Sequence, residues 1–167
     1  FDATEYLIGK GHQSIACITG YKHGAATEDR LQGYKNALQH HNIGFRPELV
    51  FTVEDDVMNY GIEVFDKLVS AEPPVTAVFV PAGDMVAIGI IKEAKRRGVK
   101  VPSELAVVGY DDIPAAEVIE PALTTVRQPK LEMGDYAINM IVDKIEGRES
   151  GIKHKELPTK FIIRESA

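Results

Sequence analysis

The stretch Val107-Val108-Gly109-Tyr110-Asp111-Asp112-Ile113-Pro114 carries the strongest indication of the fold. In it, an apolar run ends abruptly in a glycine, an aromatic residue and two adjacent carboxylates. A buried parallel strand shows this pattern where its carboxyl end opens into a ligand crevice. The stretch therefore predicts that the chain binds a small polar molecule and does not catalyse a reaction.

Helical and strand-like segments alternate on both sides of this stretch. Helices are predicted at residues 2–10, 28–41, 57–71, 84–97 and 130–146, and strands at 14–19, 49–53, 76–80, 105–108, 123–126 and 156–164. Short apolar strands separated by longer helices indicate βαβ units. We expect an α/β fold of three layers, in which a doubly wound, mostly parallel sheet carries helices on both faces.

The bulk properties exclude several classes of function. The chain has 167 residues, of which 44% are hydrophobic and 26% charged, as in an ordinary soluble globular domain. A net charge of −6 repels phosphate backbones, so this segment alone is a poor nucleic-acid binder. The single cysteine, Cys17, cannot form an internal disulfide and is expected to be buried.

No membrane or secretion segment is evident in the sequence. No apolar run approaches the roughly 20 residues of a membrane span. Residues 1–10 lack a signal peptide pattern and begin without an initiator methionine. We therefore expect a fragment of a longer protein with no membrane-spanning segment.

Candidate binding residues follow the predicted strands, because ligands of doubly wound sheets lie outside the carboxyl ends of the strands. These turns are residues 20–24, followed by Arg30, and residues 54–56, 81–84 and 110–112. Together they supply a guanidinium, several carboxylates and an aromatic ring. Arg30 lies near the start of a helix, where the dipole disfavours a cation. It is either a solvated or helix-pairing cation or a ligand contact.

The carboxylates have structural and functional interpretations. Asp84 is most simply an N-cap of the following helix. Asp111 and Asp112 are either turn and cap residues or acceptors for the paired hydroxyls of a sugar. Two adjacent carboxylates repel each other, and a ligand or a neighbouring cation would relieve that repulsion.

Catalytic and metal-binding patterns are absent from the sequence. It contains no G-x-S-x-G, P-loop or H-E-x-x-H motif, and the turn at 20–24 lacks the third glycine of a dinucleotide fingerprint. The histidines show no metal-ligand spacing; they are His12, His23, His40, His41 and His154. His40-His41 and the basic run at 95–97 suit the ends of helices. No cofactor or metal is predicted.

Six segments in order resemble the effector-binding core of lactose-repressor/galactose-repressor (LacI/GalR) transcription regulators. They are GHQSIA at 11–16, RLQGYKNAL at 30–38, VTAVF with DMVAIG at 75–79 and 84–89, VP with VVGYDD at 101–102 and 107–112, PALTTV with Gln128 at 121–128, and LP with RES at 157–158 and 164–166. The resemblance covers almost the whole chain.

This resemblance implies a periplasmic-binding-protein-like fold of type I with two subdomains. Residues 3–125 and 157–165 would form the C-terminal subdomain, and residues 128–150 would cross to the N-terminal subdomain, which is not in this sequence. The family's helix-turn-helix is absent as well. The crossing helix would then have an apolar face with no partner in this chain. We expect it to pack against another copy or fragment, or to be poorly ordered.

The resemblance also implies site residues. Arg30 and Asp111 match effector-contacting positions, and His23 and Gly24 lie in the first-strand loop that would touch the effector. Asp56 and Gly83 stand where relatives often have a stacking aromatic and a polar residue, which suggests a more polar, less stacked ligand or a different register in that loop. The family's dimer surface would run through 57–61, 85–92 and 115–119. Its positions are Val57, Met58, Gly61, Met85, Ile88, Gly89, Lys92, Ala115, Val118 and Ile119.

Three functions follow from these observations. The first is the effector-sensing part of a cytoplasmic LacI/GalR-type regulator that binds a sugar or similar metabolite and forms a homodimer or higher oligomer. It would reach operator DNA only through the absent domain. The alternative is a periplasmic sugar-binding protein of an ABC transporter. An α/β enzyme is disfavoured because no nucleophile, base and metal constellation is present.

Overall fold

The computed structural model describes residues 1–20, 24–53, 57–148 and 154–167. Four parallel strands form the central sheet in the order β2-β1-β3-β4: β1 (Ile15–Thr19), β2 (Val50–Thr52), β3 (Ala77–Phe79) and β4 (Ala106–Val108). The register places Ile15 beside Ala77 and Ala77 beside Ala106. This arrangement confirms the predicted α/β fold with a mostly parallel sheet.

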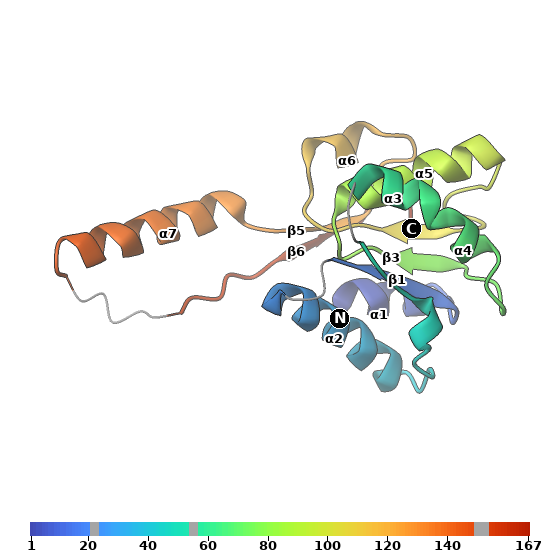
Figure 1. Cartoon of the computed structure of the whole chain (residues 1–167), viewed down its shortest axis with the longest axis horizontal. Helices are drawn as coiled ribbons and strands as arrows, with labels where there is room; N and C mark the ends of the chain where they lie inside the picture. The colour runs from blue at the N-terminus through green and yellow to red at the C-terminus, as the bar shows by residue number, and fades with distance from the viewer. Residues whose placement is uncertain (21–23, 54–56, 149–153) are drawn as a thin grey trace.

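Helices cover both faces of the sheet (Figure 1). One face carries α1 (Asp2–Gly9) and α2 (Ala25–His40), and the other carries α3 (Val57–Glu63), α4 (Phe65–Val69) and α5 (Asp84–Arg97). The remaining elements are η1 (Pro47–Leu49), α6 (Pro114–Val118), β5 (Thr125–Arg127), α7 (Lys130–Ile145) and β6 (Lys160–Ile162).

Alternate strand residues supply two separate cores. Ile15, Cys17 and Phe79 point to the α1–α2 face, where they pack with Leu7 and Tyr34. Ala16, Ile18, Val78, Val80 and Val107 pack with α4 and α5 on the other face. Because both faces are covered, the strands are continuously apolar, as the sequence indicated. Cys17 is fully buried, as predicted.

Two glycines set the spacing of α3 and α5. A Cβ on Gly61 would overlap the Val86 carbonyl oxygen and lie 3.1 Å from the Cα of Gly89. The helices therefore cross at backbone contact. The predicted single helix over 57–71 is divided into α3 and α4 at Val64. The interruption is local, since the Val64 amide still donates to Tyr60 and its carbonyl accepts from Leu68.

The last strands differ from the prediction. β5 pairs antiparallel with β6 in a separate two-stranded sheet, with Val126 opposite Phe161. β5 approaches β4 through the isolated Val108–Thr124 bridge. Ser166 fills the gap between β4 and β5: its hydroxyl donates to the Val107 carbonyl at 2.6 Å and accepts from the Thr124 amide at 2.8 Å. The final strand, β6, covers only Lys160–Ile162 and is shorter than the predicted 156–164.

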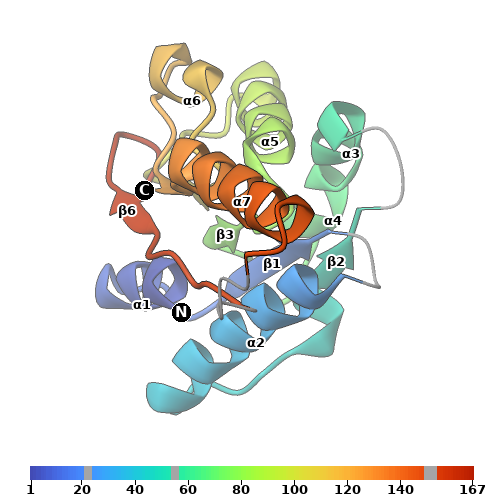
Figure 2. The same cartoon turned by 90° about the vertical axis from the view of Figure 1, so that its left-hand side faces the viewer.

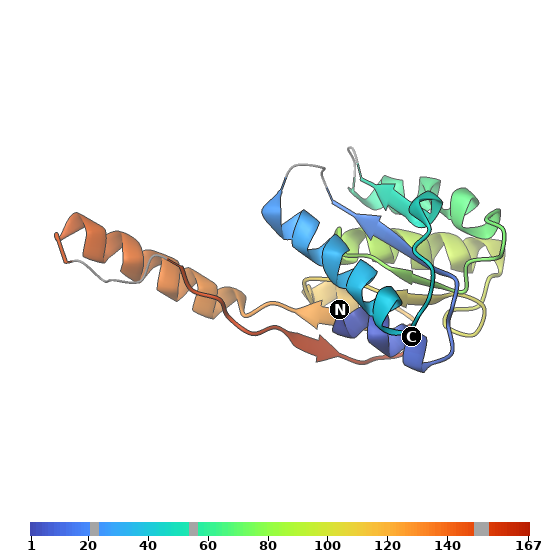
Figure 3. The ribbon, with the colours of Figure 1, turned by 90° about the horizontal axis from the view of Figure 1, so that it is seen from below.

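The helix α7 projects from the edge at which the parallel strands end (Figures 1 and 3). Viewed from that side, it stands in front of the sheet (Figure 2). No residue of α7 is buried, and its exposed apolar residues include Leu131, Ile138, Ile141 and Ile145. None of the described helices is long and apolar enough to span a membrane.

Candidate effector site at the carboxyl edge

The turn between β3 and α5 requires glycine at position 83. Gly83 is the N-cap residue of α5 and has φ +125°, a conformation that other residues rarely adopt. A Cβ at this position would lie 3.1 Å from Oδ2 of Asp111. The predicted site residues Gly83 and Asp111 are therefore immediate neighbours, although they belong to different loops.

Asp84 does not cap α5, which corrects the sequence prediction. It is the first helical residue, is 1% exposed and turns towards the loop after β4. Its Oδ2 accepts the Ile113 amide at 2.9 Å, and its Oδ1 accepts the Thr125 hydroxyl at 2.6 Å. Burial raises the pKa of this carboxyl. Asp84 thus ties the loop after β4 and the start of β5 to α5.

Asp111 and Asp112 both occupy positive φ, at +113° and +51°. Such conformations cost free energy and persist where the surroundings enforce them. The Asp111 amide donates to the Val126 carbonyl at 2.9 Å, and Gln128 Nε2 donates to Asp111 Oδ1 at 2.5 Å. Asp111 is half-buried. Its carboxylate is therefore fixed in direction at the edge of the sheet.

Asp112 has a different environment from its neighbour. Its side chain is 7% exposed and forms ion pairs with Arg127 and, at 2.8 Å, with Arg164. Burial by itself would raise the pKa of Asp112, but the hydrogen bonds from the two arginines outweigh burial and hold it below its usual value. The pairing relieves the repulsion between the adjacent carboxylates. Asp112 thus links its loop to β5 and to the C-terminal segment.

Arg30 lies in the second turn of α2 and reaches the same edge. Its Nη1 donates to the Pro81 carbonyl at 2.9 Å, and its Cζ lies 3.8 Å from the centre of the Tyr110 ring. Pro81 belongs to the turn that ends at Gly83, and Tyr110 precedes Asp111. The structure therefore brings Arg30, Gly83 and Asp111 to one edge of the sheet through shared neighbours.

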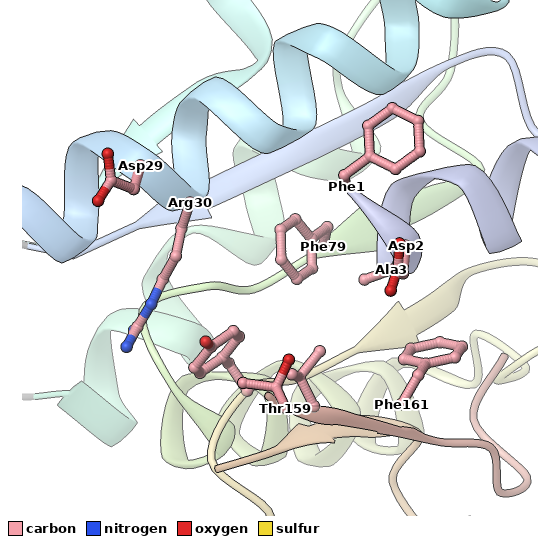
Figure 4. A pocket seen from close by; sticks show the side chains of 10 residues that line it. Phe1, Asp2, Ala3, Asp29, Arg30, Phe79, Thr159 and Phe161 are labelled. Carbon is pink, nitrogen blue, oxygen red and sulfur yellow. The ribbon is translucent and has the colours of Figure 1, made fainter. Parts of the chain in front are cut away.

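A hollow of about 290 Å³ adjoins Arg30 on the α1–α2 face (Figure 4). Its lining residues are Phe1, Asp2, Ala3, Asp29, Arg30, Phe79, Tyr110, Val126, Thr159 and Phe161. The volume is at the lower limit for small-molecule pockets. The hollow is lined by Arg30 but not by the other two predicted site residues at this edge, Gly83 and Asp111.

The remaining predicted residues have varied positions. Gly24 is exposed and is the N-cap residue of α2. His23 and Asp56 lie outside the described residues. On the predicted dimer surface, Met85, Lys92 and Val118 are exposed, and Ala115, Ile88 and Ile119 are partly buried. Gly61 and Gly89 are buried at the helix crossing, and the side chains of Val57 and Met58 are not described.

Sequence reasoning did not predict three contacts in this site, although Pro81 and Tyr110 lie in turns that it named. Gln128 binds Asp111, the Pro81 carbonyl binds Arg30, and the Tyr110 ring stacks against Arg30. Gln128 belongs to one of the six segments that resemble the family, which was its only signal. The arrangement offers hydrogen-bond donors and acceptors for a polar ligand. Among the described residues at this edge, it offers no paired nucleophile and base.

Comparison with known proteins identifies the kind of domain. A family model described as a periplasmic binding protein-like domain matches residues 4–167. Over 166 residues, the chain is 35% identical to the HTH-type transcriptional repressor CytR of Escherichia coli (strain K12), covering 99% of this chain and 48% of CytR. It is 37% identical to the NTD biosynthesis operon regulator NtdR of Bacillus subtilis (strain 168), covering 96% of this chain and 49% of NtdR.

A solved structure gives the same result. The transcriptional regulator CelR in its cellobiose complex matches with a TM-score of 0.91 and 35% identity, covering 98% of this chain and 50% of that one. The chain belongs to the family of periplasmic binding protein-like domains. Its relatives are LacI-family transcription regulators, which confirms the resemblance found in the sequence. The chain spans about half the length of these relatives.

Proposed function

We propose that this chain is the effector-sensing half of a LacI/GalR-type transcription regulator, and that it binds a sugar or sugar derivative. The observation that carries this proposal is the meeting of Arg30 and Asp111 at the carboxyl edge of the sheet, through the turn at Pro81 and Gly83. Arginine supplies several N–H donors, and a carboxylate supplies acceptors. A sugar hydroxyl uses both kinds of partner.

Two solved relatives support the class of ligand. One is the transcriptional regulator CelR in complex with cellobiose, and the other is a LacI family transcriptional regulator from Enterococcus faecium with bound ribose. The resemblance implies that Asp56 and Gly83 stand where relatives often have a stacking aromatic and a polar residue. We therefore expect contact with His23, Gly24 and Asp56 to be polar rather than aromatic.

The proposal assigns a role to the projecting helix. In this proposal, residues 3–125 and 157–165 form one subdomain. Residues 128–150 cross to a second, N-terminal subdomain, whose other residues lie outside this chain. Since α7 leaves from the edge that carries Arg30 and Asp111, a subdomain packed on its apolar face would stand opposite that edge. The effector would then lie between two halves and favour their closed arrangement.

Partners follow from the same assignment. We propose a homodimer through the surface at 57–61, 85–92 and 115–119, and contact with operator DNA through a helix-turn-helix outside this chain. Effector binding would couple to DNA binding through the relative position of the halves. We place the protein in the cytoplasm. The relatives are regulators, which supports this function over a periplasmic transport protein or an enzyme.

Thermal-shift measurements on the full-length protein test the proposal. The panel contains free sugars, sugar phosphates, nucleosides and purines. A sugar or sugar derivative should raise the melting temperature in a concentration-dependent way, because a ligand stabilises the state it binds. The same ligand should change the affinity for operator DNA. A ligand that is turned over, or a shift produced only by purines, would overturn the proposed ligand class.

A further inference from the structure

Three potential metal ligands meet where α1 packs against the end of α2. Glu5 lies in α1, His40 is the last residue of α2, and His41 is its C-cap. One ligand atom from each residue lies within 4.8 Å of the others. Within the described residues, this is the one such group of three. It lies at the opposite end of α2 from Arg30.

The spacing suits a tetrahedral ion. Zn²⁺ binds histidine nitrogen and carboxylate oxygen at about 2.0–2.2 Å, which puts neighbouring ligand atoms about 3.3–3.5 Å apart. His41 Nε2 and Glu5 Oε1 are paired by a hydrogen bond at 3.3 Å, a separation that also fits two ligands of one ion. The His40 ring centre is 5.1 Å from that of His41, and His40 is exposed. The ligand atoms of all three residues lie within 4.8 Å of one another, so the exposed His40 side chain has to move only a short way to join the other two.

The surroundings also favour a cation. The C-terminus of a helix carries a partial negative charge, and both histidines occupy the C-terminus of α2. The His41 and Glu5 side chains remain 35% and 42% exposed, so an ion could enter and water could complete its coordination. Imidazole nitrogen with one carboxylate is a donor set that Zn²⁺ uses.

We propose that Glu5, His40 and His41 bind Zn²⁺, at a site separate from the effector edge. The bound ion would join α1 to α2 and so fix the two helices that cover one face of the sheet. The histidine pair alone gave no such signal in the sequence, because Glu5 lies 36 residues before His41 and is brought close by helix packing.

Calorimetric titration of the full-length protein with Zn²⁺ tests the site. We expect saturable binding of Zn²⁺. The affinity should fall by about tenfold or more in Glu5→Gln and in His41→Gln, because even residues that only support a metal's ligands lower its affinity by that factor when they are replaced. His154→Gln is the matched control, since His154 also lies 3.2 Å from a glutamate, Glu156, but belongs to no group of three among the described residues. That variant should bind Zn²⁺ like the unaltered protein.

Two further measurements complete the test. Crystals soaked in Zn²⁺ should show an anomalous peak between Glu5, His40 and His41. His40→Gln, at an exposed position, provides a variant whose fold is checked by circular dichroism. Absence of Zn²⁺ binding, or equal affinity in Glu5→Gln, His40→Gln and the control, would overturn the proposal. Arg30→Ala should leave Zn²⁺ binding intact, so failure here is distinguishable from failure of the effector assignment.

Discussion

The carboxylate of Asp84 accepts a hydrogen bond from the Thr125 hydroxyl at 2.6 Å, across 41 residues of sequence. This bond joins the start of α5 to β5, and the second oxygen of Asp84 holds the Ile113 amide. The loop that carries Asp111 and Asp112 is therefore held by hydrogen bonds to a buried carboxylate at the start of α5. The geometry of the candidate site depends on this connection.

Removal of the Asp84 carboxylate should destabilise the fold. Asp84→Ala leaves the Ile113 amide and the Thr125 hydroxyl without their acceptor, at about 1–3 kcal/mol for each buried group. Urea unfolding measures the loss. Glu63→Ala, at an exposed position, is the control and should stay within about 0.5 kcal/mol of the unaltered protein. Equal stabilities of the two variants would contradict the assigned role of Asp84.

Arg30 should be essential for the effector response. Arg30→Ala removes the guanidinium that spans Tyr110 and the Pro81 carbonyl, and with it the proposed ligand contact. We expect the full-length variant to lose effector-dependent release or binding of operator DNA while it keeps its far-UV circular dichroism. Arg30→Lys should fail as well, since lysine lacks the planar fork. An unchanged dose response in either variant would refute the assignment.

A side chain at Gly83 should displace Asp111. In Gly83→Ala the new Cβ would lie 3.1 Å from the Asp111 carboxylate, and the φ of +125° would add strain of about 1–3 kcal/mol. We expect both lower stability and weaker effector binding. Gly98→Ala is the matched control, because Gly98 also has positive φ but faces open space. It should lose stability in urea unfolding while effector affinity, measured by calorimetry, stays the same.

The ion pairs of Asp112 make stability depend on pH. Its pKa in the folded protein is below the usual 3.8, so its contribution is present above pH 3.8 and is lost as the pH falls through the lowered value. In Asp112→Asn this contribution is absent at every pH. The stability difference between the unaltered protein and the variant should therefore shrink as urea unfolding is repeated below pH 3.8. A constant difference would contradict this role of the ion pairs.

The isolated chain should bind the effector weakly. In the proposed arrangement half of the cleft belongs to a subdomain outside this chain, so only part of the ligand's hydrogen bonds can form. Calorimetry on the isolated chain and on the full-length protein compares the two. Submicromolar affinity of the isolated chain would show that its own residues complete the site.

Short-range patterns in the sequence predicted most of the fold. The apolar runs around Cys17, Val78 and Val107 identified strands covered on both faces, and the turns after them identified the edge that carries Arg30 and Asp111. The apolar spacing along residues 130–145 identified α7. These features depend on neighbouring residues, so a single sequence reveals them.

The division of roles between Asp111 and Asp112 could not be predicted. It depends on Gln128, Arg127 and Arg164, which lie 15 to 52 residues away and reach the loop only in the folded chain. Asp84 was mistaken for an N-cap for the same reason, since its partner Thr125 is distant in sequence. The proximity of Glu5 to the histidine pair likewise arises from helix packing.

The position of Ser166 has a consequence for how the protein is made. Its hydroxyl closes the space between β4 and β5, and Ser166 leaves the ribosome 59 residues after Val107. A nascent chain that ends before Ser166 would expose the Val107 carbonyl and the Thr124 amide in what becomes the interior. Synthesis must therefore continue past Ser166 before the Val107 carbonyl and the Thr124 amide can form these hydrogen bonds.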